Sequence, residues 1–235
     1  MRSTPFAVAL LAGCFAIPAH AALSFSDDFS GPAINTFWWT PSTAGANTVA
    51  LENGRIVMTQ SNYYDSGGLT LNFNVTGDFV ATVDYSLIDW PAANYQRIGI
   101  STGFGAVERS QHPGWFNEAY VSDFQHNITT VGTADTSGTL KMERTGNTLT
   151  GSFWNGTGWT FIGAFTHDTL LADAPLGLAL WNGYSYATLP VKVSFDNFHL
   201  DASGMAPIPE PEAWAMLLAG LGLIGFVARR RASNF

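Results

Sequence analysis

The sequence predicts an all-β protein whose body is a sandwich of antiparallel strands. Apolar and polar residues alternate along several segments, turn residues separate these segments at short intervals, and no part of the body has a sustained 3.6-residue period. A content of 24 glycines among 235 residues and an aromatic share of 14% fit short strands joined by tight turns. We expect one β-sandwich domain over residues 22–204, between a leader at 1–21 and a terminal segment at 205–235.

The expected strands follow the alternation in chain order. Apolar residues at every second position predict strands over 69–75 and 79–87, with Thr82, Asp84 and Ser86 on the face opposite the core. Asn53-Gly54 predicts a hairpin turn between 48–51 and 56–59, and Gly146-Asn147 predicts another between 140–144 and 148–154. In the last strand the apolar phase shifts after Phe195, which predicts a bulge near Asp196-Asn197.

The first 21 residues are typical of an export signal. Arg2 supplies the positive charge, residues 6–17 supply the apolar stretch, and Ala19-His20-Ala21 is a cleavage site for signal peptidase. Residues 11–14 also resemble a lipobox, so lipidation of Cys14 is the alternative.

The last 31 residues contain an ordered set of features. Pro209, Glu210 and Pro211 precede an apolar run over 213–228, which Arg229, Arg230 and Arg231 follow. As a helix the run spans roughly 24 Å, less than the ~30 Å hydrocarbon core of a bilayer. Such a short transmembrane helix can stop in the membrane with its arginines on the cytoplasmic side. The alternative is a lasting single-pass anchor.

These three parts together resemble the PEP-CTERM sorting signal. The resemblance implies export by a bacterium with an outer membrane, an inner-membrane intermediate held by the helix, and removal of the tail by an exosortase. The final location would be the cell surface or the medium. Genomes that encode such tails usually make an extracellular polysaccharide, which makes this polymer the expected partner.

Segments of the body resemble concanavalin A-like (laminin G-like) jelly rolls. The resemblance rests on Phe25-Ser26-Asp27-Asp28-Phe29-Ser30-Gly31, on the run over 140–149 that leads into two tryptophans, and on Phe195-Asp196-Asn197-Phe198-His199-Leu200. It implies that the last strand pairs beside the first.

Charge and motif spacing exclude several functions. Residues 22–203 carry 16 acidic and 6 basic side chains, so we expect no nucleic-acid partner. No two acidic residues of the body are two or four apart, so the catalytic motif of jelly-roll glucanases is absent and we expect no enzyme. A hydrolase or lyase whose carboxylate pair comes from different strands remains the alternative.

The histidines lack metal-ligand spacing, so we assign no metal or cofactor. A structural calcium ion would suit the acidic surface, but its ligands are not placed by the sequence.

Aromatic residues are the remaining candidates for binding. Trp154 and Trp159 flank a hairpin turn, whether it is centred on Asn155-Gly156 or on Thr157-Gly158, or is a loop of four residues. Every register puts both tryptophans on one face with Phe161 and Phe165, and Leu149, Phe153, Ile162 and Ala164 on the other. If the first face is exposed, it can stack on sugars; the alternative places Trp159, Phe161 and Phe165 in the core.

A second candidate is the cluster formed by Trp181, Asn182, Tyr184 and Tyr186 after a buried strand. These side chains either bind a ligand or pack over the core edge. We expect Trp38, Trp39, Trp90 and Trp115 to pack in the core or at its edge. The functional hypothesis is non-catalytic glycan binding in the envelope or matrix, and a structural or adhesion protein without sugar specificity is the alternative.

Overall fold

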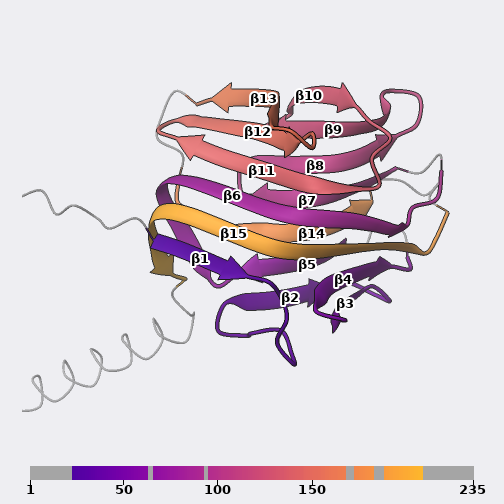
Figure 1. Ribbon diagram of the computed structural model, residues 1–235, viewed down its shortest axis with the longest axis horizontal. Helices are drawn as coiled ribbons and strands as arrows, with labels where there is room; N and C mark the ends of the chain where they lie inside the picture. The colour runs from indigo at the N-terminus through magenta and orange to yellow at the C-terminus, as the bar shows by residue number, and fades with distance from the viewer. Residues whose placement is uncertain (1–22, 63–65, 93–94, 168–171, 183–187, 209–235) are drawn as a thin grey trace, which may run out of the picture.

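The computed structural model describes residues 23–62, 66–92, 95–167, 172–182 and 188–208. Two antiparallel sheets pack face to face, as Figure 1 shows. Across sheet A the strands are, in spatial order, β13 (Trp159–Thr166), β12 (Thr148–Trp154), β11 (Ser137–Thr145), β6 (Phe73–Asp89), β15 (Val191–Pro207), β4 (Arg55–Gln60) and β3 (Thr48–Glu52), with β1 (Leu23–Asp27) paired to β15. Across sheet B they are β10 (Asn127–Gly132), β9 (Asn117–Phe124), β8 (Gly105–His112), β7 (Gln96–Thr102), β14 (Gly177–Asn182), β5 (Ser66–Leu71) and β2 (Trp39–Thr43). The predicted all-β sandwich is confirmed.

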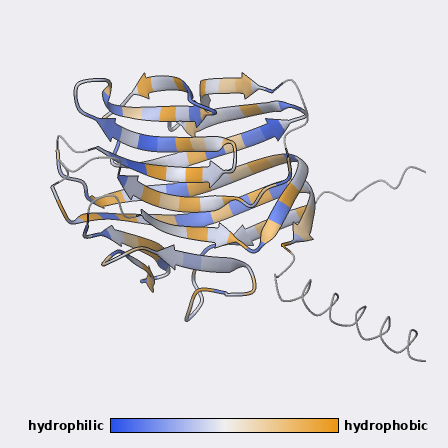
Figure 2. Cartoon of the chain, turned by 180° about the vertical axis from the view of Figure 1, so that it is seen from behind, coloured by the Kyte–Doolittle hydropathy of each residue, from blue (hydrophilic) through white to orange (hydrophobic). Residues whose placement is uncertain are grey.

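The core lies between the two sheets and follows the alternation of each strand. In β6, Phe79, Ala81 and Val83 are buried, whereas Thr82 and Asp84 lie on the outer face of sheet A. The same alternation is visible along the other strands in Figure 2. Because successive side chains of a strand point to opposite faces, each sheet presents one apolar face to its partner and one mixed face to the outside.

A polar contact crosses the core and ties the sheets together. The hydroxyls of Tyr85 on β6 and Tyr120 on β9 are 2.9 Å apart, and that of Tyr120 donates to Asp135 at 2.9 Å. Burial raises the pKa of Tyr85 to about 12. Both hydroxyls therefore stay neutral at physiological pH and satisfy each other inside the core.

Several local predictions are confirmed. Asn53 and Gly54 both have positive φ and join β3 to β4, and Gly146-Asn147 joins β11 to β12. The register of β15 shifts between Asp196 and His199, with Asn197 at a φ of 50°, so the expected bulge is present. β1 pairs with β15 along 23–27, as the jelly-roll resemblance implied.

The strand expected over 69–75 is wrong, because the chain changes sheets within it. β5 ends at Leu71 in sheet B and β6 begins at Phe73 in sheet A. Asn72 stabilises the crossing: its side-chain amide donates to the carbonyl of Thr36 at 2.9 Å, and its side-chain oxygen accepts from Thr40 at 2.6 Å. Alternation continues through such a corner, so periodicity alone does not reveal it.

The predicted signal peptide, Cys14 and the expected transmembrane helix over 213–228 lie outside the described residues. Within the described part of the chain, no helix is long and apolar enough to span a membrane.

Candidate functional site

The outer face of sheet B carries a groove built by four neighbouring strands. Arg97 on β7 lies between Ser110 on β8 and Trp181 on β14, with which it is paired in register. Asp123 on β9 is paired with Ala106 on β8. These positions alternate with the core residues of the same strands, so the buried inner face fixes which side chains reach the groove.

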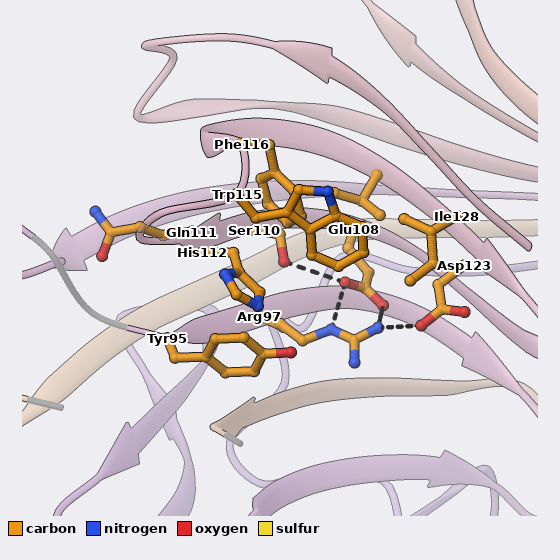
Figure 3. Close-up of a pocket in the computed structure, with 11 residues that line it drawn as sticks. Tyr95, Arg97, Glu108, Ser110, Gln111, His112, Trp115, Phe116, Asp123 and Ile128 are labelled. Carbon is orange, nitrogen blue, oxygen red and sulfur yellow. Dashed lines mark hydrogen bonds and ion pairs between the residues drawn. The ribbon is translucent and has the colours of Figure 1, made fainter. Parts of the chain in front are cut away.

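Three charged side chains form the floor of this groove (Figure 3). The Nε of Arg97 donates to Glu108 at 2.7 Å, its second guanidinium nitrogen donates to the other carboxylate oxygen of Glu108, and that same nitrogen donates to Asp123 at 2.7 Å. Ser110 adds a hydrogen bond to Glu108 at 3.2 Å. The side chain of Glu108 has no exposed surface, although it faces away from the core. We call Arg97, Glu108 and Asp123 the charged floor.

Burial sets the electrostatics of the charged floor. It raises the pKa of Glu108 above the ordinary value, while the hydrogen bond and charge of Arg97 act in the opposite direction. Burial also opposes the charge of Arg97, but its bonds to Glu108 and Asp123 outweigh burial and raise its pKa. Arg97 is therefore a permanently charged, immobilised group whose position two carboxylates fix.

Aromatic rings enclose one end of the groove. The rings of Tyr95 and His112 lie edge to face at 4.2 Å, and those of His112 and Trp115 at 5.1 Å. Figure 3 shows these side chains together beside Arg97 and Glu108. Trp115 is 59% exposed, so the expectation that it packs at the core is wrong.

Beyond Arg97 the groove opens to a volume of about 330 Å³. The Trp181 ring lies on one side, with its centroid 5.0 Å from the Arg97 guanidinium carbon. Gln125 and His126 contribute from the turn between β9 and β10, where both have positive φ, as a two-residue hairpin turn requires. An aromatic face, a carboxylate, an amide and an imidazole thus line one open groove. This combination suits a ligand with apolar C–H faces and many hydroxyl groups.

The structure separates the predicted Trp181 cluster. Trp181 lies in the groove, whereas Asn182 is 5% exposed and lies on the core side of β14. The amide of Asn182 therefore does not join Trp181 in the groove. Tyr184 and Tyr186 lie outside the described residues.

The predicted hairpin pair lies on the other sheet. Trp154 and Trp159 are paired in register and are 41% and 42% exposed, and Phe161 beside them is also exposed. The alternative that buries Trp159 and Phe161 is therefore wrong. Between Gly151 and Ser152 the register with β13 shifts at Ile162, so Ala164 is exposed and Phe165 packs against the core, the reverse of the expected faces.

The charged floor was missed by sequence reasoning. Glu108 and Asp123 are 15 positions apart and come together only because β8 and β9 form a hairpin. Pro113-Gly114 between two alternating segments was the available signal for that hairpin. Among the described residues no three His, Asp or Glu side chains form a metal-binding group, so the ligands of a structural calcium ion stay unassigned.

Comparison with known proteins identifies a sorting motif in the C-terminal segment and the fold of the body. Residues 207–231 match the PEP-CTERM protein-sorting motif. The chain carries a PEP-CTERM tail. This tail contains Pro209, Glu210 and Pro211 together with the cluster from Arg229 to Arg231, and it implies export through a membrane-anchored intermediate and processing by an exosortase. No curated protein matches the sequence.

Solved structures share the architecture at low identity. They include the carbohydrate recognition domain of Emp47p (12% identity, 76% of this chain and 94% of that chain, TM-score 0.55). A LamA variant from Zobellia galactanivorans in complex with laminaritriose and laminaritetraose is also similar (11% identity, 77% and 98%, TM-score 0.58). So is the apo Crh5 transglycosylase (14% identity, 79% and 86%, TM-score 0.55). These similarities show that the body has a concanavalin A-like jelly-roll fold.

Proposed function

We propose that this exported protein binds a glycan without cleaving it, and that the ligand lies in the groove on the outer face of sheet B. The observation that carries the proposal is the Trp181 ring held beside Arg97 along an open groove of about 330 Å³. A fixed aromatic face gives a sugar ring a stacking surface at little cost in conformational entropy.

The contacts of Arg97 support this proposal. Because Glu108 and Asp123 hold the guanidinium in place, the guanidinium in turn holds Trp181. The carboxylate of Asp123 remains 16% exposed and can accept hydrogen bonds from sugar hydroxyls. A groove prepared in this way loses little freedom when a ligand enters.

Charge favours a neutral polysaccharide as the ligand. Arg97 is paired with two acidic side chains, within a body that carries 16 acidic and 6 basic residues. An anionic polymer would be repelled unless a cation bridged the two. Neighbours of the same fold include a carbohydrate recognition domain and a LamA variant in complex with laminaritriose and laminaritetraose, which agrees with this class of ligand.

The route of export suggests where the ligand is met. With the PEP-CTERM tail removed by an exosortase and the leader by signal peptidase, the mature protein would reach the cell surface or the medium. The extracellular polysaccharide of the producing bacterium is the proposed partner there.

Affinity electrophoresis of the purified full-length protein tests the proposal. We expect retardation in gels that contain laminarin, a mannan or the bacterium's own exopolysaccharide. Trp181→Ala should weaken the binding about tenfold, which corresponds to ~1.4 kcal/mol. Phe37→Ala is the matched control, because it removes an aromatic ring that is 65% exposed and whose ring contacts, Trp38 and Phe73, do not line the groove. Wild-type migration unaffected by any of these polymers would contradict the proposal.

One observation favours hydrolysis as a second candidate function. Glu108 and Asp123 both contact Arg97 in one groove, and burial raises the pKa of Glu108, as a general acid requires. The complete burial of Glu108 argues for a structural role instead. Incubation with laminarin and mannan followed by reducing-sugar analysis separates the two: product formed by the wild type and lost in both Glu108→Gln and Asp123→Asn would establish hydrolysis.

A further inference from the structure

A single row of side chains crosses the outer face of sheet A. Trp159 on β13 pairs with Trp154 on β12, and Thr139 on β11 pairs with Asp84 on β6. Leu140 pairs with Phe153, which places Thr139 beside Trp154. Asp84 pairs with Asp196 on β15. With strands about 4.8 Å apart, this row continues to β4 and measures about 24 Å from end to end.

The row begins at a rigid aromatic surface. The Trp154 and Trp159 rings lie edge to face with centroids 5.5 Å apart, and the Lys141 ammonium lies 5.0 Å from the Trp159 ring. The connecting loop of four residues is held by Asn155, whose side-chain oxygen accepts hydrogen bonds from the backbone of Thr157 at 3.0 Å and of Gly158 at 2.9 Å. Both tryptophans are therefore fixed before any ligand arrives.

The row ends in a polar hollow of about 290 Å³. Within it, Asp84 accepts hydrogen bonds from Thr139 at 2.6 Å and from Asn197 at 2.9 Å. Asp196 forms an ion pair with Arg55 at 3.3 Å. The bulge in β15 places Asn197 in this hollow, and the hydroxyl groups of Ser86, Ser137 and Ser194 complete its lining.

We propose that this row is a second glycan-binding surface, on which a neutral polysaccharide lies across the strands from Trp154 and Trp159 to the hollow at Asp84 and Asp196. The inference rests on the proposed function, because the groove supplies the first site on the opposite sheet. One molecule then holds two chains at once and cross-links the polymer. Such bivalency raises the avidity for a polysaccharide network well above the affinity of either site.

The composition of the row argues for a sugar over a second copy of the protein. Three exposed aromatic residues stand at the sheet edge. The rest of the row consists of hydroxyls, the amide of Asn197, the hydrogen-bonded carboxylate of Asp84 and ion-paired side chains. A specific protein–protein interface buries about 1,200–2,000 Å² and has an apolar centre. The cations near the row are paired, Lys141 with Glu143 at 3.2 Å and Arg55 with Asp196, so nothing here favours an anionic polymer.

Binding through sheet A is isolated by removing the groove tryptophan first. In the Trp181→Ala background we expect residual binding to laminarin or a mannan, and the further change Trp154→Ala with Trp159→Ala should weaken it at least tenfold. Phe37→Ala in the same background is the matched control. Thermal unfolding of every variant establishes that it is folded.

A bridging assay tests the bivalency directly. Wild-type protein bound to insoluble β-glucan particles should capture soluble fluorescent laminarin, and the Trp154→Ala/Trp159→Ala variant should bind the particles but capture at least tenfold less. If Trp181→Ala alone abolishes all binding, the second surface is refuted while the groove stands. If the wild type binds no polysaccharide, both proposals fail. If light scattering finds a dimer that Trp154→Ala disperses, the occupant is a second copy and the proposal is overturned.

Discussion

The outer faces of the two sheets use similar residues in opposite ways. On sheet B, Arg97 and Glu108 form an ion pair in which the carboxylate is completely buried. On sheet A, Arg55 and Asp196 form an ion pair whose arginine is half exposed. The alternation of apolar and polar residues along the strands predicts a polar outer face for both sheets and does not distinguish them. What separates them is the cover of aromatic rings over the charged floor, which sheet A lacks at its polar hollow.

This difference has an energetic consequence. A buried charge depends on its partner, because the partner replaces hydration that the charge has lost. An exposed pair remains hydrated and contributes little to stability. The groove on sheet B should therefore be rigid and intolerant of change, and the row on sheet A should tolerate substitution.

Removing the arginine of each pair gives the largest contrast. Arg97→Ala leaves the buried carboxylate of Glu108 without its main partner and should lower the free energy of unfolding by about 3–5 kcal/mol. Arg55→Ala, the matched control on sheet A, should cost about 1 kcal/mol or less. Urea unfolding measures both. Equal losses would show that the cover over the charged floor does not exclude water.

The second contrast concerns pH. Because the pKa of Glu108 is raised, the folded protein binds its proton more tightly than the unfolded chain does. The stability that this proton confers is complete below the ordinary glutamate value of 4.5 and is lost as the pH rises through the higher native pKa. The wild type should therefore lose unfolding free energy relative to Glu108→Gln as the pH rises above 4.5.

A pH-independent difference between the wild type and Glu108→Gln would contradict the effect attributed to burial.

The smallest expected effect is at the tryptophan hairpin. Asn155→Ala removes hydrogen bonds that lie in solvent, so the free energy of unfolding should fall by only about 1 kcal/mol. In the Trp181→Ala background, Asn155→Ala should reduce the free energy of glycan binding by more than it reduces the free energy of unfolding, because Trp154 and Trp159 lose their fixed geometry. Thr148→Ala, which removes an exposed contact with Thr166 at the other end of the same hairpin, should alter stability similarly and binding not at all.

Local sequence was sufficient for much of sheet A and its hairpins. The turns at Asn53-Gly54 and Gly146-Asn147, the inward face of β6 and the bulge at Asn197 all depend on neighbouring residues, and each is confirmed. The errors at Asn72 and Phe165 have different causes. At Asn72 the chain changes sheets while the alternation continues, so the pattern does not reveal the corner. Before Phe165 an extra residue at a bulge reverses the faces among residues that are apolar on both sides, so the alternation does not reveal the bulge.

The groove could not be obtained in the same way. Trp181 was recognisable as an aromatic residue after a buried strand, but its neighbour Asn182 points into the core. Arg97, Glu108 and Asp123 belong to three consecutive strands joined by hairpins, and the register of both hairpins decides which of their side chains meet. Glu108 is buried beside the rings of Tyr95, His112 and Trp115, and this burial leaves no trace in its local sequence.

The position of β15 links the architecture to the order of synthesis. This strand lies at the centre of sheet A, between β6 and β4, yet it is the last of the body to be made, and β1 pairs with it across more than 170 residues of chain. Until Pro207 has been delivered, two halves of the sheet lack the segment that joins them, and their inner edges have unpaired backbone groups. A chain crossing a membrane in the N-to-C direction would thus finish folding only when its passage is nearly over, when the sorting tail is the next part to arrive.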